Sequence, residues 1–397
     1  MQVSVFYLPS IGSRGEIEMG MAGLRPELYQ QMLEELREQA QLADELGYDS
    51  ISFTEHHFHV EGFEISNNPV LLDLFVALQT KRIRVGQLGI VLPSQNPLRV
   101  AEDIAMLDHM SGGRANAGFA RGYQRRWVDV MAQQLHGIHG VKPWEHDEMD
   151  QANRQAFEEH FQIIKRAWSD GMMDYQGKYW QIPPEGTPWD IDATKQWGAG
   201  VDDENIVRQI GVVPKPLQKP HPPIFQPFAS SESTIRWCAR EGVTAILPPL
   251  YPSLQKQLYE VYHDEATKAG RSLAPGEGLG VLRDVVVADS DEEALELWHN
   301  SGAFCGAAWF SPFGFDRGLT DPARGERYTP QEMMELGMLL VGTPDTVSRQ
   351  MEALLEQTPV RWLFDWTYIG LMPHDKIMRS LELFATKVLP RFADAPA

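Results

Sequence analysis

The sequence contains few of the residues on which several common protein classes depend. Only two of its 397 residues are cysteines, Cys238 and Cys305, and their spacing fits neither a disulfide framework nor a metal motif. Basic residues number 35 against 55 acidic ones, so the formal net charge is −20. This charge argues against nucleic acid or an anionic membrane surface as a partner. The scarcity of cysteine favours a reducing compartment, and we expect the cytoplasm.

Long apolar runs are also missing from the chain. No stretch approaches the roughly 18 consecutive apolar residues that a transmembrane helix needs, so we expect no membrane partner. The N-terminal stretch MQVSVFYLPS has no basic region before an apolar run. It is therefore interpreted as a first strand and not as a signal peptide. Hydrophobic residues make up 43% of the chain, which is enough for a large core.

Apolar periodicity alternates between strand-like and helix-like segments along the chain. Asn-Pro pairs at 68–69 and 96–97 are typical of helix starts, with asparagine as the cap and proline at the first helical position. The pattern predicts eight strands, each followed by a helix. The strands are expected at 3–8, 50–54, 83–92, 114–120, 224–229, 244–247, 278–288 and 361–369. Such alternation predicts parallel strands with right-handed crossovers, and eight units favour a (β/α)₈ barrel, the TIM-barrel fold.

The chain is longer than a barrel requires. A barrel needs about 250 residues, so more than a hundred residues must lie in insertions. The candidates are segments near 122–150, 170–222 and 304–330, which we expect at the end of the barrel where the strands have their carboxyl termini. No repeat, low-complexity tract or linker separates parts of the sequence. We therefore expect residues 1–397 to form one domain with lid-like insertions.

A cluster of titratable residues follows the second expected strand. The stretch SISFTEHHFH contains Glu55, His56, His57 and His59 within five positions. In a barrel, the carboxyl ends of the strands form the active site, where an imidazole can hold or deliver a proton and a carboxylate can fix its tautomer. The alternative is a polar cluster that only caps the strand. A metal site is disfavoured because adjacent histidines on an extended chain point in opposite directions, so we expect no metal.

Two further segments suit a phosphate group. Arg121 ends the fourth strand in NAGFARGY, where a guanidinium can bind phosphate with two hydrogen bonds. FASSEST, residues 228–234, ends the fifth strand and begins a helix with Ser230, Ser231 and Thr234. Helix N-termini with free N–H groups bind phosphate. The alternatives are a structural ion pair for Arg121 and simple helix capping for the serines.

Glycines interrupt the third expected strand. Gly86 and Gly89 lie in VGQLGIVLP, within an otherwise β-rich segment. Glycine at such a position indicates either a close approach of the backbone to a ligand or a packing adjustment inside the barrel.

Several stretches together resemble the bacterial luciferase-like family of flavin-dependent monooxygenases. The residues that carry the resemblance are LADELGYDSISFTEHHF, RVGQLGIVLPSQNPLRVAEDIAMLDHMSGGRANAGFARGY, PKPLQKPHPPI, VGTPDTV and LELFATKVLPRF. They extend from residue 40 almost to the C-terminus. The resemblance implies a TIM barrel that binds FMN, or in some branches a deazaflavin, at the carboxyl ends of the strands.

The resemblance also implies roles for individual residues. His56 matches the catalytic histidine, with Glu55 or His57 expected to orient it. Leu88–Gly89 matches a peptide, often cis, that lies under the flavin ring. For the phosphate, the matching residues are Arg121, Ser231 and Thr234, with Ser230 beside them. Ala120 stands where luciferase-type chains have cysteine, and Ser230 where they have glutamate, which argues against light emission and a long-chain aldehyde substrate.

The function implied by the resemblance is the oxygenation of a small organic substrate. Reduced FMN, supplied by a separate NAD(P)H:flavin reductase, would react with O₂ to give a flavin peroxide in a water-poor pocket. The peroxide would then attack a carbonyl, by Baeyer–Villiger or aldehyde oxidation, or hydroxylate an activated carbon. The alternatives are a deazaflavin-dependent dehydrogenase on the same barrel and a non-catalytic flavin-binding protein. The resemblance further implies a homodimer that pairs through helices near the second and third strands.

Overall fold

Eight parallel strands form a closed ring in the computed structural model, which describes residues 1–135, 137–145 and 147–392. The ring strands are β1 (Gln2–Tyr7), β2 (Ser50–Phe53), β3 (Arg84–Gln87), β5 (Ala115–Ala120), β8 (Ile224–Gln226), β9 (Thr244–Leu247), β10 (Leu279–Val287) and β14 (Trp362–Thr367). Parallel pairing runs from β14 through β1 and β2 to β3 and from β5 through β8 and β9 to β10. β3 neighbours β5, and β10 pairs with β14, so the ring is closed. The predicted (β/α)₈ barrel is confirmed.

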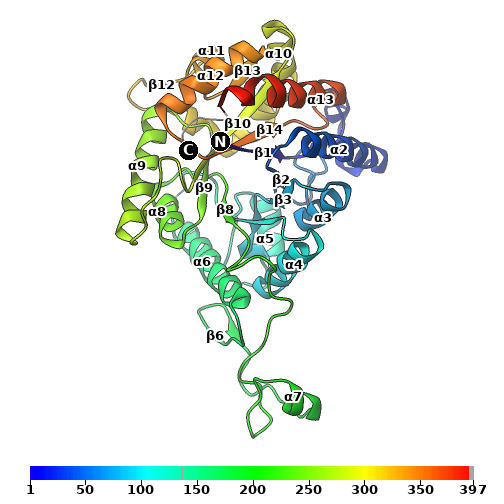
Figure 1. Ribbon diagram of the computed structural model, residues 1–397, viewed down its shortest axis with the longest axis vertical. Coiled ribbons are helices and arrows are strands. Elements are labelled where there is room, and N and C mark those ends of the chain that lie inside the picture. Colours follow the sequence, from blue (N-terminus) through cyan, green and yellow to red (C-terminus); the bar gives the residue numbers. More distant parts are fainter. Residues whose placement is uncertain (136, 146, 393–397) are drawn as a thin grey trace. The chain divides into compact units, whose positions relative to one another are not determined.

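The chain forms two compact units. The first consists of residues 1–90, 116–119 and 223–397 and contains the barrel strands, and the second consists of residues 91–115 and 120–222. The helices of the first unit are α1 (Arg14–Glu18), α2 (Pro26–Leu46), α3 (Pro69–Gln79), α8 (Glu232–Glu241), α9 (Pro252–Lys268), α10 (Asp291–Trp298), α11 (Pro330–Glu335), α12 (Pro344–Gln357) and α13 (His374–Leu383). Figure 1 shows the strands β1, β10 and β14 inside a ring of helices that includes α2, α8, α9, α12 and α13.

The second unit is largely helical. Its helices are α4 (Pro97–Met110), α5 (Arg125–Met131), α6 (Glu148–Trp168) and α7 (Asp192–Trp197), and β6 (Tyr175–Gln176) pairs with β7 (Gln181–Ile182) in an antiparallel hairpin. α4 packs on α6, where Trp168 Nε1 donates to Ala101 O at 2.9 Å. Residues 122–150 and 170–222, which were predicted as insertions, thus contribute α5, α7 and the hairpin.

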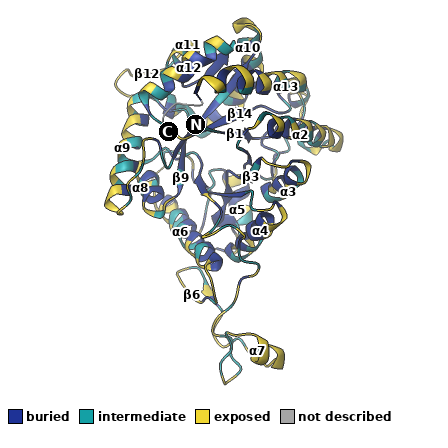
Figure 2. Cartoon of the chain, viewed as in Figure 1, coloured by how far each residue is buried: buried dark blue, intermediate teal, exposed yellow. Residues whose placement is uncertain are grey.

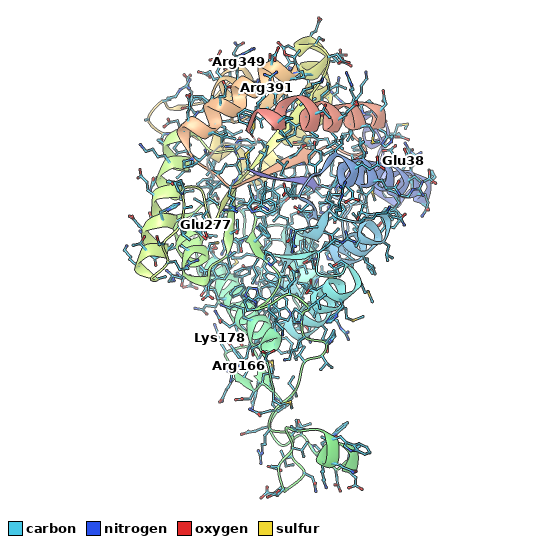
Figure 3. The ribbon with its side chains drawn as sticks, viewed as in Figure 1. Glu38, Arg166, Lys178, Glu277, Arg349 and Arg391 are labelled. Atoms are coloured by element: carbon cyan, nitrogen blue, oxygen red, sulfur yellow. The ribbon has the colours of Figure 1, made fainter. Side chains whose placement is uncertain are left out.

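The barrel core follows from the alternation of side chains along each strand. Phe225 of β8 packs edge-on against Trp362 and Phe364 of β14, with ring centroids 5.4 and 6.0 Å apart. Ser4 and Ser52 satisfy each other by a hydrogen bond of 3.0 Å between β1 and β2. In Figure 2 the barrel strands are mostly buried, whereas helices around them such as α2 and α13 expose one face. Charged side chains such as those of Glu38, Arg349 and Arg391 project from these outer faces (Figure 3).

Some elements differ from the sequence-based prediction. The expected strand 83–92 is broken at Leu88–Gly89 into β3 and β4 (Ile90–Val91), and the peptide between these residues is cis. A short strand that was not predicted, β13 (Leu340–Gly342), pairs with β10 outside the ring. Residues 299–319 continue α10 as π- and 3₁₀-helical turns, and β11 (Thr320–Asp321) pairs with β12 (Glu326–Arg327). No helix in the described ranges is both long and apolar enough to cross a bilayer.

A buried acid–amide pair connects α3 to β3. Gln87 Nε2 donates to Asp73 Oδ2 at 2.5 Å, and Asp73 is fully buried. Burial raises the pKa of the Asp73 carboxyl well above its ordinary value, although the hydrogen bond from Gln87 acts in the opposite direction. Among the described residues, Asp73 Oδ1 and Gln87 Oε1 have no hydrogen-bond partner. A protonated Asp73 would offer its O–H to Gln87 Oε1, which satisfies both atoms.

We predict that Asp73→Asn stabilises the protein at pH 8 and that this advantage shrinks as the pH falls. The pKa of the Asp73 carboxyl is raised in the folded state. The free energy of unfolding of the parent therefore falls as the pH rises above about 3.9, the pKa of an unfolded aspartate. Asparagine keeps both hydrogen bonds and does not titrate. The stability difference is measured by thermal unfolding between pH 5 and 8. The samples are the parent, Asp73→Asn and the exposed control Asp170→Asn. A difference between Asp73→Asn and parent that does not change with pH would contradict it.

Candidate functional site

The segment after β2 brings the predicted histidine cluster to the carboxyl end of the barrel. β2 ends at Phe53, and the chain then turns back on itself. His56 N donates to Ser66 O at 2.9 Å, and Ser66 Oγ donates to Thr54 O at 2.5 Å. These backbone and hydroxyl contacts fix residues 54–66 as an ordered loop, so the side chains that follow the strand have defined directions.

Both ring nitrogens of His56 have polar neighbours. Nδ1 lies 2.9 Å from Thr54 Oγ1, and Nε2 lies 3.4 Å from Glu64 Oε1. The residue is only 8% exposed. Burial, together with the nearby His57, lowers the pKa of His56 to about 3, which keeps the ring neutral at neutral pH. An ionised Glu64 acts in the opposite direction because it favours a charged ring.

Glu55 and His57, the other two predicted catalytic residues, form a pair with each other. Glu55 Oε1 lies 3.0 Å from His57 Nε2; Glu55 is buried and His57 is partly buried. Thr54 and Glu64 contact the two ring nitrogens of His56. The orienting role expected for Glu55 or His57 stays a prediction.

Glu64 is a member of this cluster that the sequence reasoning missed. Its carboxylate is buried and accepts a hydrogen bond of 2.6 Å from Trp309 Nε1, while His59 Nδ1 lies 3.4 Å away. The residue has a φ of +51°, in the left-handed region that glutamate seldom adopts. No motif marks Glu64, since it lies eight positions after His56 and its indole partner is 245 positions further along the chain.

A pocket of about 470 Å³ opens beside this cluster. It brings the predicted catalytic residue His56 together with residues of the loop after β2 and of the turn before α2. The lining residues are Gly23, Leu24, Tyr29, His56, Phe58, His59, Val60, Glu64, Ile65, Ser66 and Asn67. His56 is thus accessible to a small molecule although its ring is mostly buried.

The Leu88–Gly89 peptide at the end of β3 is cis, as the resemblance implied. Of the two explanations for the glycines, close packing has direct support in the coordinates. A Cβ on Gly89 would lie 2.6 Å from the backbone of Gly118, and a Cβ on Gly86 would lie 2.6 Å from Asn116 Cβ. The glycines therefore let β3 approach β5, whatever binds above them.

Arg121 lies just after β5, in the second unit. Its Nη1 contacts Asp150 Oδ1 of α6 at 2.5 Å, and the Arg121 side chain is a quarter exposed. Asn153 of the same helix donates to Arg121 O at 3.0 Å. The structure thus contains the ion pair that sequence analysis gave as the alternative role of Arg121. A phosphate at Arg121 would share or replace Asp150.

The serines of FASSEST begin α8 in the first unit. Ser231 is the N-cap, and its Oγ accepts from Thr234 N at 3.3 Å and donates to Thr234 Oγ1 at 2.9 Å. Ser230 and Thr234 are partly exposed, so their hydroxyls face accessible space. Glu232 in the first turn would repel an anion, but Arg236 neutralises it with contacts of 2.7 and 2.9 Å. These residues fit a phosphate group as well as a simple cap.

Aromatic rings fill the carboxyl end of the barrel between β1, β8 and β14. Trp366 contacts Phe6, Phe228 and Phe310 edge-on at centroid distances of 5.6, 6.2 and 5.2 Å, and it stacks on Tyr368 at 5.4 Å. Trp366 Nε1 is buried and has no hydrogen-bond partner among the described residues.

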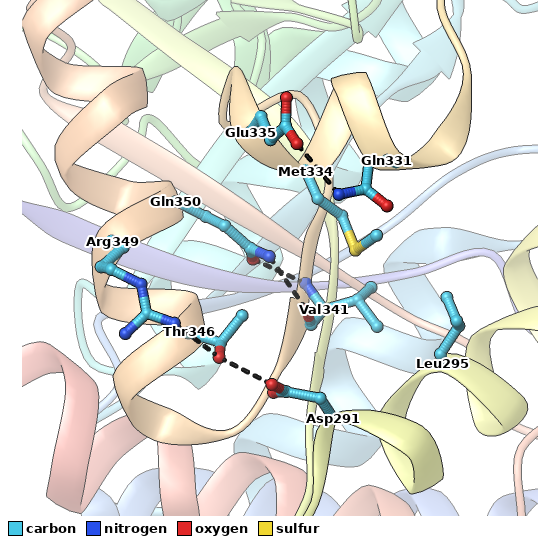
Figure 4. Close-up of a pocket in the computed structure, with 9 residues that line it drawn as sticks. All are labelled: Asp291, Leu295, Gln331, Met334, Glu335, Val341, Thr346, Arg349 and Gln350. Atoms are coloured by element: carbon cyan, nitrogen blue, oxygen red, sulfur yellow. Dashed lines mark hydrogen bonds between the residues drawn. The ribbon is translucent and has the colours of Figure 1, made fainter.

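A second pocket, of about 420 Å³, lies on the outside of the barrel among α10, β13, α11 and α12 (Figure 4). Its polar groups already serve the fold. Asp291 accepts from Thr343 N and Thr346 Oγ1, and Gln350 exchanges two hydrogen bonds with the backbone of Val341. None of the predicted site residues lines it. Within the described residues, no group of three or more histidine, cysteine or acidic side chains could hold a metal ion.

The first unit thus combines a closed barrel of parallel strands with a polar cluster after β2 that contains His56 and Glu64. The family model described as luciferase-like monooxygenase matches residues 1–361. The chain belongs to the luciferase-like monooxygenase family, as its sequence motifs indicated.

Individual relatives agree with this membership. The oxygenase component of flavin-dependent trigonelline monooxygenase from Acinetobacter baylyi is 26% identical over 375 residues, which cover 92% of this chain and 91% of the relative.

Two solved structures share the fold. The oxygenating constituent of 3,6-diketocamphane monooxygenase from Pseudomonas putida, a type II Baeyer–Villiger enzyme in complex with FMN, has a TM-score of 0.72 at 23% identity, covering 98% of this chain and 99% of that one. Coenzyme F420-dependent tetrahydromethanopterin reductase from Methanopyrus kandleri has a TM-score of 0.62 at 18% identity, covering 98% and 99%.

We predict that His56 does not titrate between pH 8 and pH 5. Its pKa of about 3 places the protonation of the ring below this range because burial disfavours the charged form. Imidazole signals of histidine-labelled protein, assigned to His56 by their loss in His56→Gln, measure the titration by NMR. Free histidine in the same buffer serves as the control. A His56 signal that moves over this pH range together with that of free histidine would contradict the prediction.

Proposed function

We propose that the protein is an FMN-dependent monooxygenase that uses reduced FMN and O₂ to oxygenate a small organic substrate. Membership of the luciferase-like monooxygenase family supports the class of reaction. In this chain the proposal rests on His56, which is buried and neutral and lines a pocket at the carboxyl end of β2. A neutral imidazole with both nitrogens in polar contact can hold or move a proton beside a reacting group.

FMN fits the residues that the chain offers. Ser231 and Thr234 at the start of α8 would bind the phosphate through hydroxyls and backbone N–H groups, with Ser230 beside them. Arg121, in the second unit, would pair with a phosphate in place of Asp150. Leu88 and Gly89 would support the ring system. When bound and reduced, FMN would supply the electrons that activate O₂.

The remaining polar residues would act around His56. Thr54 and Glu64 fix the two ring nitrogens, so the ring can present its proton in one direction. The Glu55–His57 pair is a second carboxylate–imidazole unit beside it, and we propose that it takes part in proton movement. The aromatic cluster around Trp366 would exclude water from the carboxyl end of the barrel.

We further propose that a separate NAD(P)H:flavin reductase supplies the reduced FMN. The trigonelline relative is named as an oxygenase component, which supports a two-component system. Both cysteines, Cys238 and Cys305, are free and buried, which supports a cytoplasmic location because reducing compartments preserve free thiols.

The barrel alone does not choose the cofactor, because it is also the fold of the F420-dependent reductase. The sequence relatives favour FMN over a deazaflavin. A deazaflavin-dependent dehydrogenase would reduce or oxidise its substrate without O₂. A non-catalytic flavin-binding protein would bind FMN and yet form no product with O₂ and any of a panel of carbonyl and aromatic compounds.

We predict that Arg121→Ala weakens FMN binding by roughly 10- to 150-fold, because a charge-assisted contact contributes about 1.5–3 kcal/mol. Riboflavin, which has no phosphate, should bind equally to parent and variant. The matched control is Arg125→Ala, which removes a nearby arginine that is also paired with an aspartate, Asp129. Fluorescence titration gives the affinities. Parent-like FMN affinity in Arg121→Ala would remove Arg121 from the phosphate site.

We predict that His56→Ala leaves FMN affinity nearly unchanged but lowers product formation by roughly 10²–10⁴, the effect of losing a positioned proton-transfer group. The O₂ consumed by the variant should appear as hydrogen peroxide. His263→Ala, on α9 and outside the predicted site, is the control. The role of His56 would be refuted by parent-like product yield in the variant, or by a lowered melting temperature with unchanged coupling of O₂ to product.

We also propose that the protein is a homodimer. Leu71 and Leu78 of α3 are 62% and 69% exposed although both are large and apolar. Their spacing of seven positions puts them on one face of the helix between β2 and β3. Further exposed apolar side chains lie in the first unit at Met19, Met21 and Leu24. Such residues are typical of a surface that binds another chain.

Sedimentation of the parent should give twice the chain mass of 44.9 kDa at micromolar concentration. Replacing Leu71 and Leu78 together by glutamate should produce the monomer, because charge on the contact face disfavours its burial. Glu34→Gln, an exposed change on α2, is the control. A monomeric parent would contradict the proposal.

A further inference from the structure

The carboxylate of Glu64 contacts His56, His59 and Trp309 at once. Oε1 lies 3.4 Å from His56 Nε2, whereas Oε2 accepts from Trp309 Nε1 at 2.6 Å and lies 3.4 Å from His59 Nδ1. The side chain is 1% exposed, so water does not compete for these groups. A buried carboxylate keeps its position only while donors satisfy it.

The donors around Glu64 identify it as an acceptor. The indole N–H of Trp309 can only donate. His59 Nδ1 also contacts Phe63 O at 2.9 Å, and a carbonyl can only accept, so this nitrogen carries a proton. An ionised Glu64 at 3.4 Å from Nε2 favours the proton on that nitrogen, and Nδ1 then accepts from the Thr54 hydroxyl.

Trp309 belongs to the helical turns of residues 299–319, which follow α10 and which the family motifs in the sequence do not cover. Its ring stacks on Phe63 at 5.2 Å and meets His59 edge-on at 5.0 Å. The donor to Glu64 is therefore held on both sides by rings of the loop after β2. Through this indole, a segment far along the chain reaches the histidine cluster.

We propose that Glu64 is a positioning residue that holds His56 in the Nε2–H tautomer, and that Trp309 holds Glu64 in place for it. The tautomer assignment itself does not depend on the proposed function. Its consequence rests on that function: a proton transferred by His56 would move along the Nδ1 side of the ring, through Thr54. Residues 299–319, which contain Trp309, would thereby help to set the tautomer of His56.

The test is the tautomer of His56 in flavin-free, full-length protein labelled with ¹⁵N-histidine. Long-range ¹H–¹⁵N spectra distinguish the protonated from the unprotonated ring nitrogen, and His56→Gln assigns the signals. We expect Nε2–H in the parent. Glu64→Gln should give a mixture of tautomers, because an amide can present either its oxygen or its NH₂ group to Nε2. Trp309→Phe keeps the ring packing but removes the donor, and it should shift the same signals partway.

Two matched variants control for unspecific effects. Asp73→Asn neutralises a buried carboxyl that contacts Gln87, and Trp298→Phe removes an indole that donates to another carboxylate, Asp284, at 2.7 Å. Both should leave the His56 signals at their parent positions. Unchanged His56 signals in Glu64→Gln and Trp309→Phe would overturn the inference, as would equal shifts in the controls. Because no flavin is present, this result is separate from FMN binding, whose failure would overturn the proposed function instead.

Discussion

Closure of the parallel ring is the constraint on which the rest of the structure depends. β10 pairs with both β9 and β14, and β14 pairs with β1, so every barrel strand runs in the same direction around one core. The carboxyl ends of all eight strands therefore lie at one end of the barrel. Segments far apart in the sequence, such as the loop after β2 and the turns after α10, can meet there only because the ring is closed.

The histidine cluster shows how burial and polar contacts oppose each other at this end. Burial keeps His56 neutral, with a pKa of about 3, and an ionised Glu64 at 3.4 Å favours the charged ring. In the proposed function, Thr54 and Glu64 position the neutral ring for proton transfer. Trp309 donates a hydrogen bond of 2.6 Å to the Glu64 carboxylate in the interior.

Local patterns in the sequence were sufficient to predict the barrel. Asn68 and Asn96 each cap a helix that begins with proline, as their Asn-Pro pairs predicted, and the eight predicted strands are the eight of the ring. β13 was missed because three residues are too few to establish a period of two. The division of the expected strand 83–92 into β3 and β4 was not predicted. The cis peptide at Leu88–Gly89 was expected only through the family resemblance, since no local pattern specifies a cis peptide.

The candidate site was only partly predictable. His56, Glu55 and His57 are adjacent in sequence, and their concentration of titratable groups marked them. Glu64 and Trp309 lie 245 positions apart, so no local pattern predicts their contact. Glu64 also adopts a positive φ, which its residue type does not predict. The sequence allowed Arg121 either an ion pair or a phosphate contact. The structure shows Arg121 paired with Asp150.

The most direct test of the central claim, that this barrel binds reduced FMN, is an anaerobic titration of the parent. Reduced FMN, reduced riboflavin and a reduced deazaflavin are each added to the protein, and binding is followed by absorbance and fluorescence. We predict that reduced FMN saturates one site per chain and that riboflavin binds at least about 10-fold more weakly, because it lacks the phosphate contacts. Binding of the deazaflavin without binding of reduced FMN, or equal affinity for riboflavin and FMN, would contradict the claim.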